Sequence, residues 1–468
     1  MKKTLQKMTF VAMLVSLAAC HSTDVNLDSQ VQLPTQFEQT HAARGQTEIA
    51  QWWKNWRDPQ LSRLIEQGLQ NNLDVALARS RLQEAQANSR YADADLGPTV
   101  NAQGTVGGLR SQTGKLSGSG HTNTTGNMQV AGITASWEPD FFGQKRSDAD
   151  AAQAIVLSAQ DQVHAAQMLV AGQIAESYFN IQSLRQQQDI LKQTENTLIR
   201  LKAYVQGRFS AGQANANDVL QVESRLSAVQ AQQATLDSQI ANNERAIAIL
   251  VGQTPQGFHI AKSAVIFSDV LPNPPAGTLP SEVLARRPDL SSYRNQVQAQ
   301  AAKLASAKAD LYPRFDIQFL GQTGRIDLDT NIPDLKGWST LLTGGISLPI
   351  FTNGRIQANI DAADARLKQA LLQYDKALLQ ALADVDNSYQ GQYSLNRQAQ
   401  LLQTASKQAQ KQATQAEKLF RHDAKTLDNA LNDRLTALDY QQQLVQARLQ
   451  QAKNLIQLYN ALGGGWQS

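Results

Sequence analysis

The chain has 468 residues, of which 42% are hydrophobic and 18% are charged. It carries 43 Lys and Arg against 40 Asp and Glu, and three of the lysines lie in residues 1–19, which hold no acidic residue. The rest of the chain therefore has equal numbers of basic and acidic side chains, which gives no support to a nucleic-acid partner. The single cysteine has no second cysteine with which to form a disulfide within the chain.

The N-terminus has the organisation of a secretory signal. Lysines precede an apolar run from Thr9 to Ala19, which is too short to span a membrane as a helix. Leu17-Ala18-Ala19-Cys20 is similar to a bacterial lipoprotein processing box, in which Cys20 becomes the acylated first residue. We therefore predict a signal peptide at residues 1–19 and a lipid anchor at Cys20; the alternative is a cysteine that merely ends an apolar run. By resemblance to sorted lipoproteins, His21 in place of Asp favours the outer membrane.

Residues 20–58 are predicted to form an extended, acylated lead, because most of this segment is polar and has no periodicity. Near its end lie Trp52, Trp53 and Trp56. We interpret these tryptophans as packing side chains that hold the lead against the first helix, rather than as ligand-binding groups.

The first helix is predicted from about Pro59 to Leu96, with Leu61, Ile65, Leu69 and Leu73 on one stripe. It ends at Ala94-Asp95-Leu96-Gly97-Pro98, because proline lacks an N–H and forces the preceding residue out of the helical region. The same junction returns 215 residues later as Ala309-Asp310-Leu311-Tyr312-Pro313. A repeat of this length indicates a duplicated half-domain, since a solenoid unit is much shorter.

A strand pair is predicted after Pro98. Residues 99–107 alternate between apolar and polar side chains, and residues 127–137 resume the alternation with a slip near Gly132. A period of two indicates strands with one apolar and one polar face. Residues 108–126, which are rich in Gly, Ser and Thr, are predicted to form a long exposed loop.

The second copy predicts strands at about 314–320 and 340–348, separated by a loop from about Gly321 to Gly337. Between the copies, a proline-rich segment is interpreted as an irregular connector. The predicted organisation is a first structural repeat at 59–252, a connector at 253–281, a second repeat at 282–462 and a tail at 463–468.

Long helices follow each strand pair. From Gly143 to about Gly207 there is no proline, and a seven-residue apolar register is broken only by Ser177: Val156, Val163, Val170, Leu184, Leu191, Leu198 and Val205. A return helix and the last helix, from Leu431 to Tyr459, show similar spacing. These are coiled-coil seams. Their other faces are crowded with Ala and Gln, which fits a sheet of helices rolled into a tube.

The strands allow two interpretations. Each has the length of a tilted membrane-spanning strand, but four strands cannot close a barrel and lipid does not tolerate an open sheet edge. Either these are ordinary soluble hairpins, or several chains pool their strands into one barrel. Beyond the signal no apolar run approaches the length of a membrane-spanning helix, so any crossing must be by strands. The long helices favour pooled strands in a mainly α-helical chain with a β part.

At this point the chain resembles outer membrane factors of the TolC type, and more narrowly the NodT-type lipoproteins that serve tripartite efflux pumps. The resemblance rests on the lipoprotein box, on the order of the segments and on short motifs: Trp52-Trp53, Asp58-Pro59-Gln60-Leu61, Leu284-Ala285-Arg286-Arg287-Pro288-Asp289-Leu290, Ser347-Leu348-Pro349-Ile350-Phe351, Gly354-Arg355 and Leu462-Gly463-Gly464-Gly465-Trp466. Each motif is weak alone, whereas together they cover nearly all of the chain after the signal.

This resemblance implies a homotrimer with a shared twelve-stranded β-barrel in the outer membrane of a Gram-negative bacterium and a long helical barrel that crosses the periplasm. It implies as partners a periplasmic adaptor (membrane fusion) protein, an inner membrane transporter of the resistance-nodulation-division class and outer membrane lipid. The implied function is the exit duct of an efflux pump, with drugs or other amphipathic toxicants as cargo. No cofactor is implied.

Two sets of site residues follow from the resemblance. Phe420 to Leu431 matches Phe209 to Leu220, which marks equivalent hairpin tips expected to contact the adaptor: Ser210, Gly212, Asp423 and Lys425. In related ducts, acidic residues at the start of the last helix narrow the closed entrance. Those positions correspond here to Asn429 and Asn432, a departure from the family pattern, with Asp428 and Asp433 beside them. The spacing pairs Asp428 with Asn432 and Asn429 with Asp433; the alternative interpretation is that all four are ordinary polar residues of a helix start.

An enzyme is not indicated. The six histidines lie far apart without metal-ligand spacing, no Gly-x-Ser-x-Gly occurs, and Gly114-Lys115 lacks the remaining residues of a phosphate loop. The alternative from another class is a trimeric surface fibre or adhesin anchored by a shared barrel. A fibre needs only one block of strands, whereas this chain has two hairpins interleaved with long helices.

Overall fold

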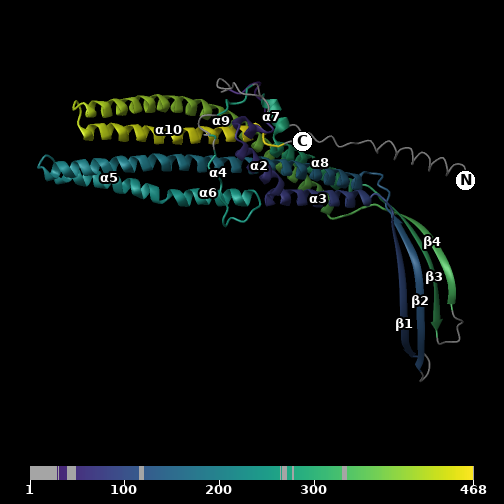
Figure 1. Ribbon diagram of the computed structural model, residues 1–468. Coiled ribbons are helices and arrows are strands. Elements are labelled where there is room, and N and C mark those ends of the chain that lie inside the picture. The colour runs from purple at the N-terminus through teal and green to yellow at the C-terminus, as the bar shows by residue number, and fades with distance from the viewer. Residues whose placement is uncertain are drawn as a thin grey trace. The chain divides into compact units, whose positions relative to one another are not determined.

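The computed structural model describes residues 29, 31–38, 49–114, 121–263, 265, 271–276, 279–328 and 335–466, and Figure 1 labels their helices and strands. The chain is mostly helical, with one sheet. Its elements are the short 3-10 helix η2 (Trp52–Trp56), α2 (Pro59–Asn71), α3 (Leu73–Ala94), β1 (Thr99–Gly114), β2 (His121–Trp137), α4 (Gln144–Ser210), α5 (Ala216–Ala234), α6 (Leu236–Leu250), α7 (Pro280–Arg286), α8 (Pro288–Ala309), β3 (Arg314–Leu328), β4 (Leu335–Ser347), α9 (Arg355–Arg421) and α10 (Leu427–Ala461).

The chain divides into two compact units. One holds the sheet, with residues 83–158 and 294–373. The other holds the described parts of residues 29–82, 159–293 and 374–468, and so contains α5, α10 and the parts of α4 and α9 that lead to the two hairpin turns. Among the described helices, none is both long enough and apolar enough to cross a membrane.

The backbone has the same form at both copies of the junction motif. At the end of α3 the N–H of Leu96 donates to the carbonyl of Asp93 over 3.2 Å, and at the end of α8 the N–H of Leu311 donates to the carbonyl of Lys308 over 3.2 Å. In each copy a strand begins directly after the proline, at Thr99 and at Arg314. The same residues therefore end a helix and start a strand twice.

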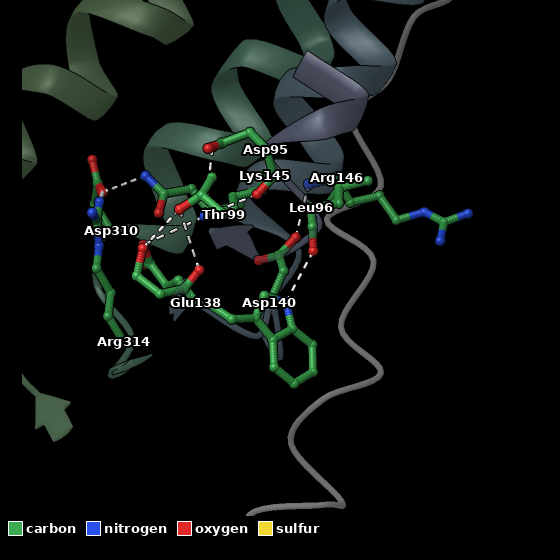
Figure 2. A network of polar contacts seen from close by, with 12 residues as sticks. Asp95, Leu96, Thr99, Glu138, Asp140, Lys145, Arg146, Asp310 and Arg314 are labelled. Atoms are coloured by element: carbon green, nitrogen blue, oxygen red, sulfur yellow. Dashed lines mark hydrogen bonds and ion pairs between the residues drawn. The ribbon is translucent and has the colours of Figure 1, made fainter. Parts of the chain in front are cut away.

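A polar network fixes this junction within the sheet-containing unit (Figure 2). The ammonium of Lys145, at the start of α4, donates to the carbonyl of Asp95 over 3.0 Å and lies 3.5 Å from its carboxylate. The counterpart of Asp95 in the second copy, Asp310, accepts hydrogen bonds from Gln144 over 2.9 Å and from Arg314 over 2.6 Å. Both aspartates of the repeated motif thus connect a helix end to a neighbouring element.

The prediction of one unbroken helix from Pro59 to Leu96 was wrong. Asn72 separates α2 from α3, because its side chain accepts hydrogen bonds from the N–H groups of Asp74 (2.8 Å) and Val75 (3.1 Å) and so caps the second helix. The break rotates Leu73 away from the stripe, and its side chain is 73% exposed.

The strands are longer than the alternation predicted. β1 and β2 pair from Thr99↔Ser136 to Gly114↔His121, and β3 and β4 from Arg314↔Ser347 to Ile326↔Leu335. Most of each predicted loop is therefore strand. The alternation fades there because Gly, Ser and Thr occupy both faces, although backbone pairing needs no apolar side chain. The tips of the two predicted loops, 115–120 and 329–334, lie outside the described residues.

The four strands form one antiparallel sheet in the order β1-β2-β3-β4. Its register is uninterrupted at Gly132, so the predicted slip is wrong. Met128 and Val130 instead lie on the face opposite to Ile133, since successive side chains of a strand point to opposite faces.

One face of the sheet carries large apolar side chains on all four strands, while its outer part also carries Arg110, Gln129, Arg325 and Lys336. Residues directly opposite each other share a face, so the register places Ile317 with Trp137 and with Gly344. The large exposed side chains of this face are Val100, Val106, Ile133, Trp137, Ile317, Phe319, Trp338, Leu342 and Ile346. The other face carries mainly Asn, Gln, Ser and Thr side chains, as at Gln318 between Ser136 and Thr343.

The coiled-coil seam predicted for α4 from the seven-residue register is buried except at Leu184, which is partly exposed. In α4 the exposed fractions are at most 9% at Val156, Val163, Val170, Leu191, Leu198 and Val205. The return helix predicted after Gly212 is divided at Thr235 into α5 and α6, whereas its counterpart α10 runs unbroken from Leu427 to Ala461.

The interpretation of the tryptophans as packing residues is confirmed. Trp52 and Trp56 have no exposed surface, and the Trp52 ring stacks on Tyr459 of α10 at 5.4 Å between centroids. Trp56 packs on Phe179 of α4 at 5.3 Å. The tryptophans therefore join the lead to α4 and α10, which the sequence did not indicate.

Asp58 continues this core into a polar network. Its buried carboxylate caps α2 by accepting from the N–H of Gln60 over 2.9 Å, and accepts the hydroxyl of Tyr178 over 2.7 Å and that of Ser263 over 3.3 Å. Burial raises the pKa of the Tyr178 phenol above its ordinary value, and the Asp58 carboxylate acts in the same direction. One carboxylate thus joins α2, α4 and the connector.

Candidate functional site

The two helical hairpins turn in the same way, as their matched sequences predicted. The N–H of Gly212 donates to the carbonyl of Phe209 over 3.0 Å, and the N–H of Asp423 donates to the carbonyl of Phe420 over 3.0 Å. Both turn residues have positive φ, +70° at Gly212 and +54° at Asp423. A left-handed residue after the last helical turn ends the helix and reverses the chain. The tips are therefore structural equivalents.

The other two tip residues differ in what their side chains do. The Ser210 hydroxyl is exposed and donates back to the carbonyl of Gln206 over 3.0 Å. The Lys425 ammonium forms an ion pair with Asp433, and both side chains are mostly buried. Lys425 therefore does not present a free charge at the tip, whereas Ser210 is accessible.

The helices that leave the tips begin differently. At the start of α5, Asn215 and Asp218 form a reciprocal capping box with two hydrogen bonds of 3.0 Å. At the start of α10 the Thr426 side chain caps no backbone N–H, and its hydroxyl instead accepts from the Asn429 amide over 2.8 Å. Asn429 is thus tied only to its own helical turn.

The four residues predicted for the entrance separate into distinct environments. Asn429 and Asn432 are exposed, and Asn432 accepts from Arg225 of α5 over 3.4 Å. Asp433 is half-buried between Lys425 and Gln412, whose amide donates to it over 2.9 Å. One oxygen of the Asp428 carboxylate is buried without a hydrogen-bond partner. The structure therefore does not bring Asn429 and Asp433 together as one pair, because Asp433 is held against α9.

A link between the two hairpins was not found by sequence analysis. The guanidinium of Arg434 on α10 donates to Gln410 of α9 over 3.0 Å and to Gln193 of α4 over 2.9 Å. Below it, an apolar cluster joins Leu198 and Leu201 of α4 to Leu431 of α10. Helical periodicity places Arg434 on a face, but it carries no signal for a partner 241 residues away.

Cys20, predicted as the lipid anchor, lies outside the described residues. Within the part of the chain that is described, no group of three or more His, Cys, Asp or Glu side chains is arranged to hold a metal ion.

Comparison with known proteins decides the family. The sequence profile of the family described as outer membrane efflux protein matches residues 64–253 and 279–464. The chain belongs to the outer membrane efflux protein family. The resemblance inferred from its motifs is thus confirmed, and the protein is an outer membrane component of an efflux system.

Individual members of the outer membrane efflux protein family cover almost the whole chain. It is similar to the pyoverdine export outer membrane protein OpmQ of Pseudomonas aeruginosa, with 31% identity over 99% of this chain and 98% of OpmQ. It is also similar to the cation efflux system protein CusC of Escherichia coli, with 28% identity over 89% of each chain. The solved structure of the outer-membrane channel OprN has the same fold, with a TM-score of 0.81, 23% identity and coverage of 94% of this chain and 98% of OprN.

Proposed function

We propose that three copies of this chain form the exit duct of a tripartite efflux pump, passing small molecules from the periplasm to the exterior. The observation that carries the proposal is the four-stranded sheet, which has large apolar side chains from all four strands on one face and two free edges, β1 and β4. Lipid does not tolerate unpaired strand edges, so the β1 edge of one copy pairs with the β4 edge of the next. Three copies supply twelve strands, which leave room for a lumen.

The long helices of this assembly extend into the periplasm, and their tips meet a periplasmic adaptor that connects to an inner membrane transporter of the resistance-nodulation-division class. Gly212 and Asp423 lie at the two equivalent tips, and the exposed Ser210 stands beside the first. The named cargoes of the relatives differ, pyoverdine for OpmQ and cations for CusC. We assign drugs or other amphipathic toxicants as the cargo class.

Single-channel recording tests the duct. The purified full chain, reconstituted in a planar bilayer, should give discrete conductance steps from a trimer that cross-linking confirms. A trimeric surface fibre would have a filled anchor, so an intact trimer that inserts without conducting would reject the duct in favour of the fibre.

We further assign the closed entrance to the start of α10, at Asn429 and Asn432. Both side chains are exposed, whereas Asp433 is engaged by Lys425. Three copies of each amide form rings near the axis, which close by hydrogen bonds rather than through bound cations.

Acylation of Cys20 is proposed from the lipoprotein box. Cys20→Ala should abolish lipid attachment, because the thiol is the acceptor, and leave the protein unprocessed or poorly sorted. Metabolic labelling with radioactive palmitate, followed by outer membrane fractionation, measures both effects, and Cys20→Ser serves as a nearly isosteric control that should also lose the label. Undiminished labelling of Cys20→Ala would show that the lipid is attached elsewhere.

A further inference from the structure

A cavity lies between the two helical hairpins, among α4, α9 and α10 near their periplasmic turn. Its volume is about 560 Å³, and its charged lining consists of Arg200, Arg421, Arg434 and Glu417. This is the size of a pocket for an organic small molecule rather than for a single ion. Figure 1 shows α4 running alongside the α9–α10 pair here.

The charges of the cavity do not balance. Glu417 accepts from Arg421 over 2.8 Å, so these two neutralise each other. Arg434 donates only to the neutral amides of Gln410 and Gln193. Among the residues that the structure describes, neither Arg434 nor Arg200 forms an ion pair. Two guanidinium charges on opposite hairpins therefore line one cavity without a counter-charge in its lining.

The geometry favours a bound anion over solvated arginines. Two hydrogen bonds hold the half-buried Arg434 guanidinium in one orientation before any ligand arrives, which reduces the entropy lost on binding. Leu427 and Ala430, in the first turns of α10, also line the cavity, and Thr426 leaves this helix start without a side-chain cap. The positive end of a helix dipole adds to the attraction for negative charge.

We propose that this cavity binds a small organic anion with two or more negative groups, carboxylate or phosphate, held between Arg200 of α4 and Arg434 of α10. A guanidinium can donate two parallel hydrogen bonds to a carboxylate or to a phosphate. The anion joins the α4–α5 hairpin to the α9–α10 hairpin, and its binding therefore stabilises their packing. This site is independent of the proposed duct, since it requires no membrane, adaptor or trimer.

Isothermal titration calorimetry of the detergent-solubilised full chain with citrate and with inorganic pyrophosphate tests the proposal. One or both anions should bind saturably, with one site per chain and an affinity that falls as salt rises. Arg200→Gln should weaken binding about tenfold or more, as expected for the loss of a charge-assisted hydrogen bond. Arg200 is exposed and its substitution leaves the Arg434 hydrogen bonds intact, so this variant should fold normally.

Lys411→Gln is the matched control. Lys411 is exposed on α9 and does not line the cavity, so its substitution removes the same charge outside the proposed site. Its affinity for the anion should equal that of the unchanged protein. A neutral triester of citrate should not bind. The proposal fails if neither anion binds at millimolar concentration, if Arg200→Gln and Lys411→Gln weaken binding equally, or if the triester binds as well as citrate.

Discussion

Replacing Ile317 by lysine should destabilise the membrane-inserted protein by at most about 2–4 kcal/mol per chain, the upper limit being the cost of a cation on the lipid face of a strand at the bilayer midplane. Ile317 lies on the apolar face of β3, between Trp137 and Gly344. Since the proposed trimer carries the substitution three times, the total loss of stability should be large enough to reduce membrane insertion measurably.

The neighbouring residue provides the control. Gln318 lies on the opposite, polar face, between Ser136 and Thr343, so Gln318→Lys adds the same positive charge at nearly the same depth. Both variants would be refolded into phospholipid vesicles and their unfolding followed in guanidinium chloride by tryptophan emission. Equal destabilisation by the two lysines would mean that the apolar face does not meet lipid.

Alanine at both Asn429 and Asn432 should raise channel conductance and antibiotic leakage several-fold, if the proposed constriction closes by hydrogen bonds of about 1 kcal/mol each, repeated around three chains. Asn432→Ala should account for more of the effect than Asn429→Ala. The reason is that Asn432 also accepts a hydrogen bond from Arg225 of the other hairpin, whereas Asn429 bonds only to Thr426.

The corresponding residues of the first hairpin, Asp218 and Gln221, are the control and should change conductance less when both are alanine. Because Asp218 closes a capping box, the unfolding temperature of that variant must be compared as well. The conductance of each variant is measured by planar-bilayer recording of trimers that cross-linking has verified. Unchanged conductance in the Asn429/Asn432 variant would place the constriction elsewhere.

The helical part of the fold was largely predictable because its signals are redundant. Seven apolar residues in one register predict α4, and two copies of an Asp-Leu-x-Pro junction predict both helix ends. The helix break at Asn72 was missed, because the sequence does not show whether one polar residue inside a helical pattern caps a new helix or merely faces solvent. The outer parts of β1 and β2 were missed because alternation disappears where Gly, Ser and Thr occupy both faces.

The candidate site was predictable only in its backbone. Matching Phe209 to Phe420 located both turns, since the turn residues themselves define the geometry. The side-chain partners did not follow from sequence spacing: Lys425 with Asp433 depends on how the turn packs on α10, and Arg434 with Gln193 depends on how two hairpins align. The contact of Arg434 forms across 241 residues, a separation at which periodicity carries no information.

The order of the sheet has a consequence for how the chain acquires its structure. β1 with β2, and β3 with β4, are hairpins of neighbouring segments, which close within microseconds in isolation. The central ladder is different, because Trp137 pairs with Ile317 across all of residues 138–316. The entropy of closing so long a loop makes β2 with β3 the slow step of sheet formation. Until β2 pairs with β3, each copy exposes two separate β-hairpins with apolar side chains and unpaired edges. A periplasmic holdase that shields these hairpins should therefore matter more for this protein than one that recognises its helices.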